Sequence, residues 1–175
     1  MSTEPLERPV ALEKRHHTAE FDSGAEELDS RLRECAWVNH KSGYARVFVA
    51  TRGDRVVGYY ALATAGVEKV QVPEELKRGG VPQQVPCLLL ARLAVDRSEG
   101  NRGIGKGLLV DAIRRAVCAS EDAVRALLIH ARNDEARRFY EHLGEFVQSP
   151  TDPLYLFLHL KQAKKLMPHE SELRI

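Results

Sequence analysis

An apolar run that leads into a glycine-rich segment constrains the fold of this chain more than any other feature. Cys87–Val95 (CLLLARLAV) has the pattern of a strand buried on both faces, and such a strand lies centrally in its sheet. The segment Gly100–Gly107 (GNRGIGKG) follows it. Apolar residues then recur every four positions, at Ile104, Leu108, Ala112 and Ala116. This pattern predicts a helix that starts near Gly105, directly after the glycines.

The other expected elements place this strand and helix in a larger sheet. Arg46–Arg52 and Arg55–Ala65 are β-branched and aromatic runs on either side of Gly53-Asp54, which predicts an antiparallel hairpin. A first helix is expected over residues 23–38, with Asp22 or Ser23 as its N-cap. The remaining predictions are a loop over 73–86 with one helical turn at 74–78, strands over 124–131 and 154–160, and a helix capped by Asn133.

The order of these elements predicts the fold class. A hairpin followed by strand, helix, strand, helix and strand makes an α/β fold, a mixed α+β sheet with at least one right-handed βαβ crossover. We expect residues 1–160 to form a single domain. Residues 161–175 are polar with basic residues at their start, and we expect them to form a C-terminal tail.

Composition excludes several classes of protein. The 175 residues are 43% hydrophobic and 29% charged, the profile of one soluble domain. The longest apolar stretch, Cys87–Val95, is far shorter than the roughly 20 residues of a membrane helix, and the N-terminus has no apolar signal region. We therefore expect a cytoplasmic protein. The three cysteines and seven histidines lack metal-ligand spacing, so we expect no metal and no disulfide.

The glycine segment occupies a position that suits phosphate binding. The first turn of a helix offers unpaired backbone N–H groups, and glycines let a ligand oxygen approach the backbone closely. Arg102 and Lys106 add positive charge. The alternative is a tight connection in which the glycines only turn the chain. A P-loop requires Ser or Thr where Gly107 stands, and the dinucleotide motif GxGxxG fails at Leu108.

The same segment resembles the acyl-coenzyme A loop of the Gcn5-related N-acetyltransferases (GNAT). The family pattern Q/R-x-x-G-x-G/A falls on Gly100, Gly103 and Gly105, with glycine in place of the usual Gln or Arg. The chain further resembles the acetyltransferase toxins of type II toxin–antitoxin pairs. That similarity is carried, in order, by Phe21–Gly24, Leu28-Asp29, Arg46–Val49, Val57–Ala63, Leu90–Asp96, Asn133–Gly144 and Ser149–Pro153, with Glu145 inserted where the family reads Gly-Phe.

The resemblance implies a fold and an activity. It implies a single-domain GNAT acyltransferase that transfers acetyl from acetyl-CoA to the α-amino group of aminoacyl-tRNA and so blocks translation. It also implies a homodimer silenced by a ribbon-helix-helix antitoxin. The alternatives are a GNAT enzyme for a small amine, an antibiotic or a protein N-terminus, a noncatalytic coenzyme-binding or partner-binding module, and a P-loop nucleotidase.

The resemblance also implies roles for individual residues. Tyr140 matches the family's general acid, although its place beside Ala136 and Leu143 on one helix face also suits a core aromatic residue. Asn133 is expected to cap its helix, to contact the coenzyme, or both, and Phe139 to line the coenzyme site or fill the core. The backbone of Leu93, Ala94 and Val95 is expected to hold the pantetheine arm, and the amides of Arg102, Gly103, Ile104, Gly105, Lys106 and Gly107 the pyrophosphate.

Two observations bear on the acceptor substrate. Between Arg92 and Arg138 there are ten basic and seven acidic residues, an excess of three around the coenzyme loop, and a short cluster of basic residues and histidines lies at Lys14–His17. We expect Arg92 to contact the substrate, because it precedes the ligand-facing end of its strand. That strand contains no Asp or Glu. An α-amino group, with a pKa near ~8, needs no strong base, which favours aminoacyl-tRNA or a protein N-terminus over alkylamines.

Overall fold

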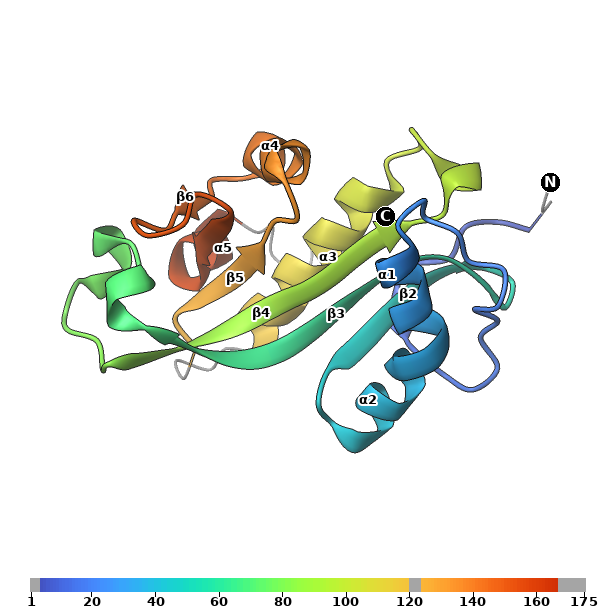
Figure 1. Cartoon of the computed structure of the whole chain (residues 1–175), viewed down its shortest axis with the longest axis horizontal. Coiled ribbons are helices and arrows are strands. Elements are labelled where there is room, and N and C mark those ends of the chain that lie inside the picture. The colour runs from blue at the N-terminus through green and yellow to red at the C-terminus, as the bar shows by residue number, and fades with distance from the viewer. Residues whose placement is uncertain (1–3, 120–123, 167–175) are drawn as a thin grey trace. The chain divides into compact units, whose positions relative to one another are not determined.

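The computed structural model describes residues 4–119 and 124–166. Seven strands lie in the order β1-β2-β3-β4-β5-β7-β6 (Figure 1). The strands are β1 (Val10–Ala11), β2 (Arg46–Arg52), β3 (Arg55–Glu68), β4 (Gln84–Val95), β5 (Ala126–His130), β6 (Val147–Gln148) and β7 (Tyr155–His159). The α-helices are α1 (Glu26–Ser30), α2 (Ala36–Ser42), α3 (Ile104–Ala119), α4 (Asp134–Leu143) and α5 (Leu160–Leu166). The short helices are η1 (Arg31–Cys35), η2 (Lys69–Gln71), η3 (Glu74–Lys77) and η4 (Arg97–Glu99).

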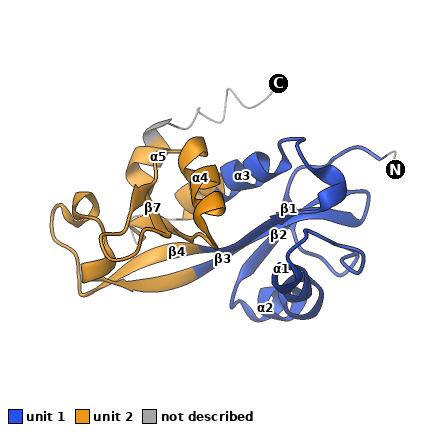
Figure 2. Ribbon diagram, turned by 45° about the horizontal axis from the view of Figure 1, so that its top comes forward, with its two compact units in different colours: residues 1–63, 90–112 blue, residues 64–89, 113–175 orange. Residues whose placement is uncertain are grey.

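The chain divides into two compact units (Figure 2). The first comprises residues 1–63 and 90–112, and the second residues 64–89 and 113–175. Each unit has its own apolar core. The expected mixed α/β architecture is confirmed. The expected boundary between a domain ending at residue 160 and a tail stays a prediction, and the chain continues past that residue as α5, in which Ala163 is buried.

The hairpin of the first unit forms as its sequence predicts. Strands β2 and β3 are antiparallel, with Arg46 opposite Leu62 and Arg52 opposite Arg55, and the register shifts between Ala50 and Thr51. The turn between the strands contains Gly53 at φ 58°, a left-handed conformation that glycine adopts at little cost. One face of this hairpin carries the buried residues Val47, Val49, Val56, Tyr59 and Ala61 of the first core.

The first helical segment differs from its prediction at both the cap and the interior. Helix α1 starts at Glu26, and its N-cap is Ala25, which makes no side-chain cap. The expected caps are engaged elsewhere: Asp22 accepts from the Gly24 amide, and the Ser23 hydroxyl donates to Asp29. A π-helical turn, η1, then separates α1 from α2. Asp22 and Ser23 therefore do not cap α1, because their side chains form other hydrogen bonds in the folded chain.

Helix α3 packs closely on β3 within the first unit. A Cβ added at Gly58 would lie 3.0 Å from Leu108 Cδ1 and 3.2 Å from Ile104 Cγ2, so a larger residue here would require these two side chains to shift. Deeper in the unit the Tyr60 hydroxyl donates to the buried carboxylate of Asp111 at 2.6 Å. These contacts set the position of the first turns of α3, where the glycine segment ends.

The prediction that Cys87–Val95 is buried on both faces is wrong for strand β4. Its flanking strands make it central, but Leu88, Leu89, Ala91 and Leu93 are only half-buried. Ala94 belongs to the core of the first unit, and Ala91, three positions earlier, packs against that same core. Strict alternation would put these two side chains on opposite faces. The buried positions of β4 accordingly change from odd to even residue numbers along the strand, from Val85 and Cys87 to Leu90 and Ala94.

The second unit contains β5, β6 and β7. Strand β7 pairs antiparallel with β5, with Leu128 opposite Phe157, and also with β6. The helical turn expected at 74–78 is confirmed as η3, over residues 74–77, whereas the expected loop at 73–86 ends earlier than predicted because β4 already starts at Gln84. Within residues 4–119 and 124–166, no helix has the length and hydrophobicity of a membrane span.

Candidate active site

The connection from β4 to α3 is folded around buried carboxylates of the first unit. Asp96 caps η4 by accepting from the Ser98 amide at 2.9 Å, and it also accepts from the Asp22 amide at 3.1 Å. Burial acts to raise the pKa of Asp96, but the hydrogen bonds from Ser98 and Asp22 outweigh it and leave this pKa below its ordinary value. Arg97 forms an ion pair with Asp22. The loop is thus anchored to the segment that precedes α1.

The glycine segment has the geometry of an anion site. Asn101 and Gly103 adopt φ of 61° and 78°, and α3 begins at Ile104, as expected to within one residue. A Cβ added at Gly103 or Gly107 would meet no atom within 4 Å, so the backbone there faces open space. The first turn of a 16-residue helix leaves N–H groups unpaired, but the Gly107 amide already donates to the Gly103 carbonyl at 3.0 Å, so of the expected pyrophosphate donors this amide is engaged. The remaining features suit an anionic group such as a phosphate.

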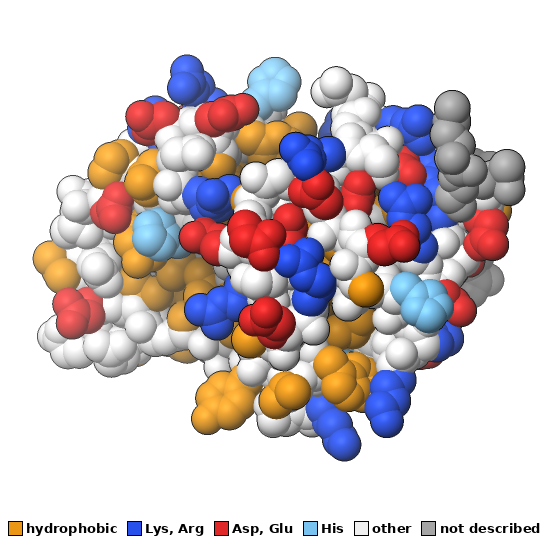
Figure 3. All heavy atoms as spheres, turned by 45° about the vertical axis from the view of Figure 1, so that its right-hand side comes forward, with side chains coloured by type: hydrophobic (Ala, Val, Ile, Leu, Met, Phe, Trp, Pro, Cys, Tyr) orange, Lys and Arg blue, Asp and Glu red, His pale blue; other side chains and the backbone are white. Residues whose placement is uncertain are grey.

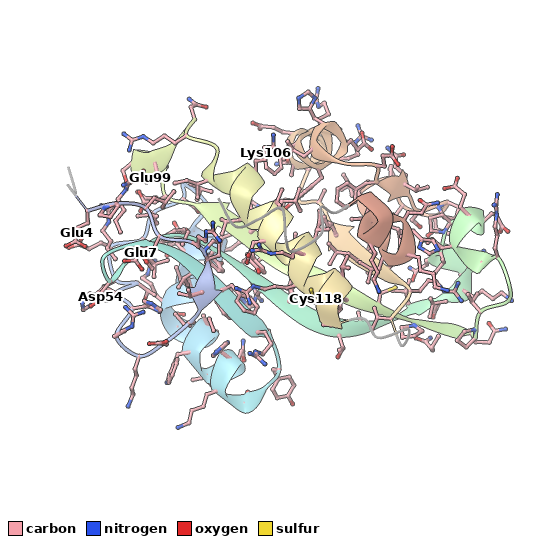
Figure 4. The ribbon with its side chains drawn as sticks, turned by 180° about the vertical axis from the view of Figure 1, so that it is seen from behind. Glu4, Glu7, Asp54, Glu99, Lys106 and Cys118 are labelled. Carbon is pink, nitrogen blue, oxygen red and sulfur yellow. The ribbon has the colours of Figure 1, made fainter. Side chains whose placement is uncertain are left out.

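A pocket borders this loop inside the first unit. It has a volume of about 240 Å³ and is lined by Leu6–Pro9, Ala50, Arg102, Gly103, Ile104, Gly107 and Leu108. The Arg102 guanidinium donates to Glu99 at 3.1 Å. Lys106 is exposed and forms no hydrogen bond or ion pair with a residue of the described ranges (Figure 4). Of the two expected cations, Lys106 is therefore available to a ligand, while Arg102 is tethered.

Arg92 lies in β4, next to Leu93, Ala94 and Val95. Its side chain is half-buried, and its guanidinium makes no hydrogen bond or ion pair with any residue in 4–119 or 124–166. The nearby Tyr59 hydroxyl is occupied, since it donates to the Leu28 carbonyl at 2.6 Å. A half-buried cation without a partner in the described chain is ready to bind an anionic or polar ligand.

The second unit carries the other expected residues on α4. Asn133 caps this helix, accepting from the Ala136 amide at 2.9 Å, as its sequence predicts. Tyr140 is 8% exposed, and Phe139 is 37% exposed with its ring 5.3 Å from that of Tyr140. Burial raises the pKa of Tyr140 to about 12. Its hydroxyl makes no hydrogen bond with a residue that the structure describes.

The basic cluster at Lys14–His17 is not a free cationic patch. Arg15 forms ion pairs with Glu13 and Asp54, and His16 is buried with its Nδ1 accepting from the Glu13 amide. Acidic and basic side chains are interspersed on the face drawn in Figure 3. Among the described residues no group of three or more His, Cys, Asp or Glu is placed to hold a metal ion.

Sequence reasoning missed the partners that hold the glycine segment. Arg52 at the end of β2 forms an ion pair with Glu99 at 2.7 Å, and these two residues are 47 positions apart. No local pattern links them, because the contact exists only once the sheet has brought β2 beside the loop. The catalytic and binding roles of the expected residues stay predictions.

Comparison with known proteins decides the family. The model of the "Acetyltransferase (GNAT) domain" matches residues 43–144. The chain belongs to the GNAT acetyltransferase family. Its alternatives as a P-loop nucleotidase or a noncatalytic module are thereby set aside, and this GNAT protein is an acetyltransferase that uses acetyl-CoA.

Individual relatives of this GNAT protein are toxins. It is 49% identical over 148 residues to the "tRNA-acetylating toxin" of Mycobacterium tuberculosis (strain ATCC 25618 / H37Rv), a match that covers 84% of this chain and 88% of the relative. It is similar to the structure of AtaT complexed with acetyl-methionyl-tRNAfMet (TM-score 0.83, 27% identity, 93% and 99% of the two chains). A tyrosine-to-phenylalanine mutant of AtaT bound to acetyl-CoA and the C-terminus of the antitoxin AtaR is also similar (TM-score 0.78, 26% identity, 94% and 99%).

Proposed function

We propose that this protein is a toxin that transfers acetyl from acetyl-CoA to the α-amino group of aminoacyl-tRNA, so that the blocked amine cannot form a peptide bond. The observation that carries the proposal is the 49% identity, over 84% of the chain, to a tRNA-acetylating toxin. The acetyl donor supplies an activated thioester. The amine adds to its carbonyl carbon, the C–S bond breaks, and the amine's proton is lost while the sulfur gains one.

The loop before α3 and strand β4 bind the donor. The amides of Arg102–Lys106 bind the diphosphate at the start of α3, and Lys106 adds a positive charge. The backbone of Leu93, Ala94 and Val95 binds the pantetheine arm and polarises the thioester carbonyl.

Tyr140 is the general acid. Its pKa of about 12 keeps the phenol protonated throughout the physiological range, and its hydroxyl has no competing partner in the described chain. It donates its proton to the sulfur as the C–S bond breaks, and the resulting phenolate recovers a proton that the amine has released to water. Phe139, packed against the Tyr140 ring, lines the coenzyme, and Asn133 contacts it from the first turn of α4.

The acceptor amine needs little help to lose its proton. An α-amino group has a pKa near ~8, so much of it is already neutral at physiological pH. This agrees with the absence of Asp and Glu from Cys87–Val95. Arg92, with no ion-pair partner in the described chain, contacts the tRNA end, since phosphate binding needs a free cation near the transferred acetyl group.

The assembly follows from the same relationship. We propose that the toxin acts as a cytoplasmic homodimer and that a ribbon-helix-helix antitoxin silences it. The structure of AtaT with the C-terminus of AtaR and acetyl-CoA supports an antitoxin that binds while the coenzyme is present. Size-exclusion chromatography with light scattering, on the toxin alone and with its antitoxin, measures both states. A monomer at micromolar concentration would contradict the homodimer.

Transfer of labelled acetyl groups tests the function directly. The purified protein is incubated with labelled acetyl-CoA and a set of charged tRNAs, and the aminoacyl group is released and identified by mass spectrometry. We expect N-acetyl-aminoacyl products. Spermidine, free lysine and a peptide with a free N-terminus serve as competing acceptors. Efficient acetylation of one of these acceptors with charged tRNA untouched would refute the proposal in favour of a small-amine or N-terminal acetyltransferase.

A further inference from the structure

A buried carboxylate lies immediately before the glycine segment. Glu99 is 4% exposed, and both of its oxygens are occupied by Arg52: Nε donates at 2.7 Å and Nη2 at 3.1 Å. This bidentate geometry is the strong form of an arginine–carboxylate pair. The hydrogen bond from Arg52 holds the pKa of Glu99 below its ordinary value. The carboxylate therefore stays ionised and paired at neutral pH.

Arg52 is itself held on its other side. Its Nη1 donates to the Glu4 carbonyl at 2.8 Å, and Leu6 forms a β-bridge with it. The guanidinium thus joins three segments of the first unit: the N-terminal segment, the end of β2 and the turn before the loop. Figure 4 labels Glu4, Glu7 and Glu99 on the corresponding parts of the ribbon.

The segment between Glu99 and α3 needs support. Asn101 adopts φ 61°, a left-handed conformation that is unusual for a residue other than glycine. Such conformations persist when the surrounding structure determines them. Glu99 anchors the start of the glycine segment through Arg52, and it anchors the middle of the segment through Arg102, whose Nη1 donates to Glu99 at 3.1 Å. The first turn of α3 anchors the end of the segment.

We propose that Glu99 and Arg52 are positioning residues that hold the glycine segment in the conformation that binds the diphosphate of acetyl-CoA. The inference rests on the proposed placement of the coenzyme at this loop. Neither residue is assigned contact with the donor. They act on the backbone that carries the binding amides, and on the direction of Arg102. Their effect is therefore on donor affinity and not on acetyl transfer itself.

The test compares two acetyl donors. Acetyl-CoA carries the diphosphate, whereas S-acetylpantetheine has the same thioester and arm without it. For the wild type, kcat/KM is expected to be at least tenfold higher with acetyl-CoA. In Glu99→Gln the KM for acetyl-CoA should rise five- to twentyfold with kcat at saturation changed less than twofold, and kcat/KM with S-acetylpantetheine should be unchanged. The acetyl-CoA advantage of Glu99→Gln should therefore be about five- to twentyfold smaller than that of the wild type.

Matched variants separate positioning from general loss of structure. Glu26→Gln removes one charge from an exposed ion pair with Arg33, and Leu32→Val loosens the core of the same unit. Both should keep the acetyl-CoA advantage, even though Leu32→Val lowers the melting temperature. Arg52→Lys keeps the charge but loses the bidentate geometry, and it should reduce the advantage in the same direction as Glu99→Gln. This variant gives the answer if Glu99→Gln does not fold.

The outcomes distinguish this inference from the proposed function. If the wild type has the same kcat/KM with both donors, the diphosphate is not bound at this loop, and both the proposed coenzyme site and the inference fail. A wild type with the advantage, retained in Glu99→Gln and Arg52→Lys, overturns the inference alone. Equal losses with both donors would show a structural role and also overturn it.

Discussion

Replacing Tyr140 by phenylalanine removes one hydroxyl and tests the catalytic assignment most directly. A positioned general acid contributes roughly 10²- to 10⁴-fold to a rate, which corresponds to about 2.7–5.5 kcal/mol in the activation free energy. We therefore expect kcat of Tyr140→Phe to fall by roughly 100-fold or more. The ring is retained, so the KM for acetyl-CoA should change little.

The structure also sets the expected effect of this substitution on stability. The Tyr140 hydroxyl has no hydrogen bond to a described residue, so the typical net loss of about 0.5–1.5 kcal/mol for a broken bond does not arise. The free energy of unfolding should therefore change by less than about 1 kcal/mol. Tyr60→Phe is the matched control. Its hydroxyl donates to the buried Asp111 at 2.6 Å, so that variant should lose roughly 1.5–3 kcal/mol, the range for bonds to charged groups.

Single-turnover acetyl transfer to charged tRNA and urea denaturation of both variants complete the experiment. The expected result is a slow, stable Tyr140→Phe and a less stable Tyr60→Phe whose kcat stays within a few fold of the wild type. If the kcat of Tyr140→Phe stays within about fivefold of the wild type, the loss is smaller than a general acid contributes, and the assignment of Tyr140 as general acid would be wrong. Loss of activity together with a large loss of stability would instead identify Tyr140 as a core residue.

Three further predictions follow from the site. Arg92→Gln should raise the KM for aminoacyl-tRNA and reduce the slope of the logarithm of the tRNA binding constant against the logarithm of salt concentration by roughly one, because one phosphate contact is lost. Its melting temperature should be unchanged, and an unaltered salt slope would remove Arg92 from the tRNA site. Asn133→Ala should lose about 1 kcal/mol of stability because the helix cap is lost, whereas Asn133→Ser should restore the stability but leave the KM for acetyl-CoA raised. Equal KM values in the wild type and Asn133→Ser would show that Asn133 only caps its helix. Burial raises the folded-state pKa of Tyr140 from 10 to about 12, so its contribution to stability is complete below pH 10 and is lost as the pH rises from about 10 to 12, a loss absent from Tyr140→Phe. In the same pH series kcat should rise near the amine pKa of ~8 and show no decline before pH 10.

Local signals in the sequence were sufficient wherever neighbouring residues determine the structure. Gly53-Asp54 closes the hairpin, Asn133 caps α4, and the spacing of Ile104, Leu108 and Ala112 defines α3, because turn, cap and helix contacts all form within a few residues. The same type of reasoning failed at α1. Asp22 and Ser23 are good cap residues, but they are bound to Arg97 and Asp29 in the folded chain.

The candidate site shows the same division. The glycine segment, Arg92, Asn133 and Tyr140 could be found from the sequence, since motif and family pattern mark them. The sequence could not show whether each side chain is free or already bound to another residue, because that depends on groups far away in the chain. Arg102 is tethered by Glu99, Arg15 is neutralised by Glu13 and Asp54, and Arg92 has no partner among the described residues.

The sequence by itself determined the class of fold, the family and the loop that we propose to bind the coenzyme, since periodicity and motif spacing are properties of the chain read in order. Only the tertiary structure decided that Glu99 is buried against Arg52 and that Tyr140 is shielded with its proton retained. Burial and ion pairing depend on which distant segments the sheet and helices bring together, and they set both the charge state and the freedom of a side chain. Packing therefore decides which charges and hydroxyl groups of the candidate site are available, although the candidate residues themselves are visible in the sequence.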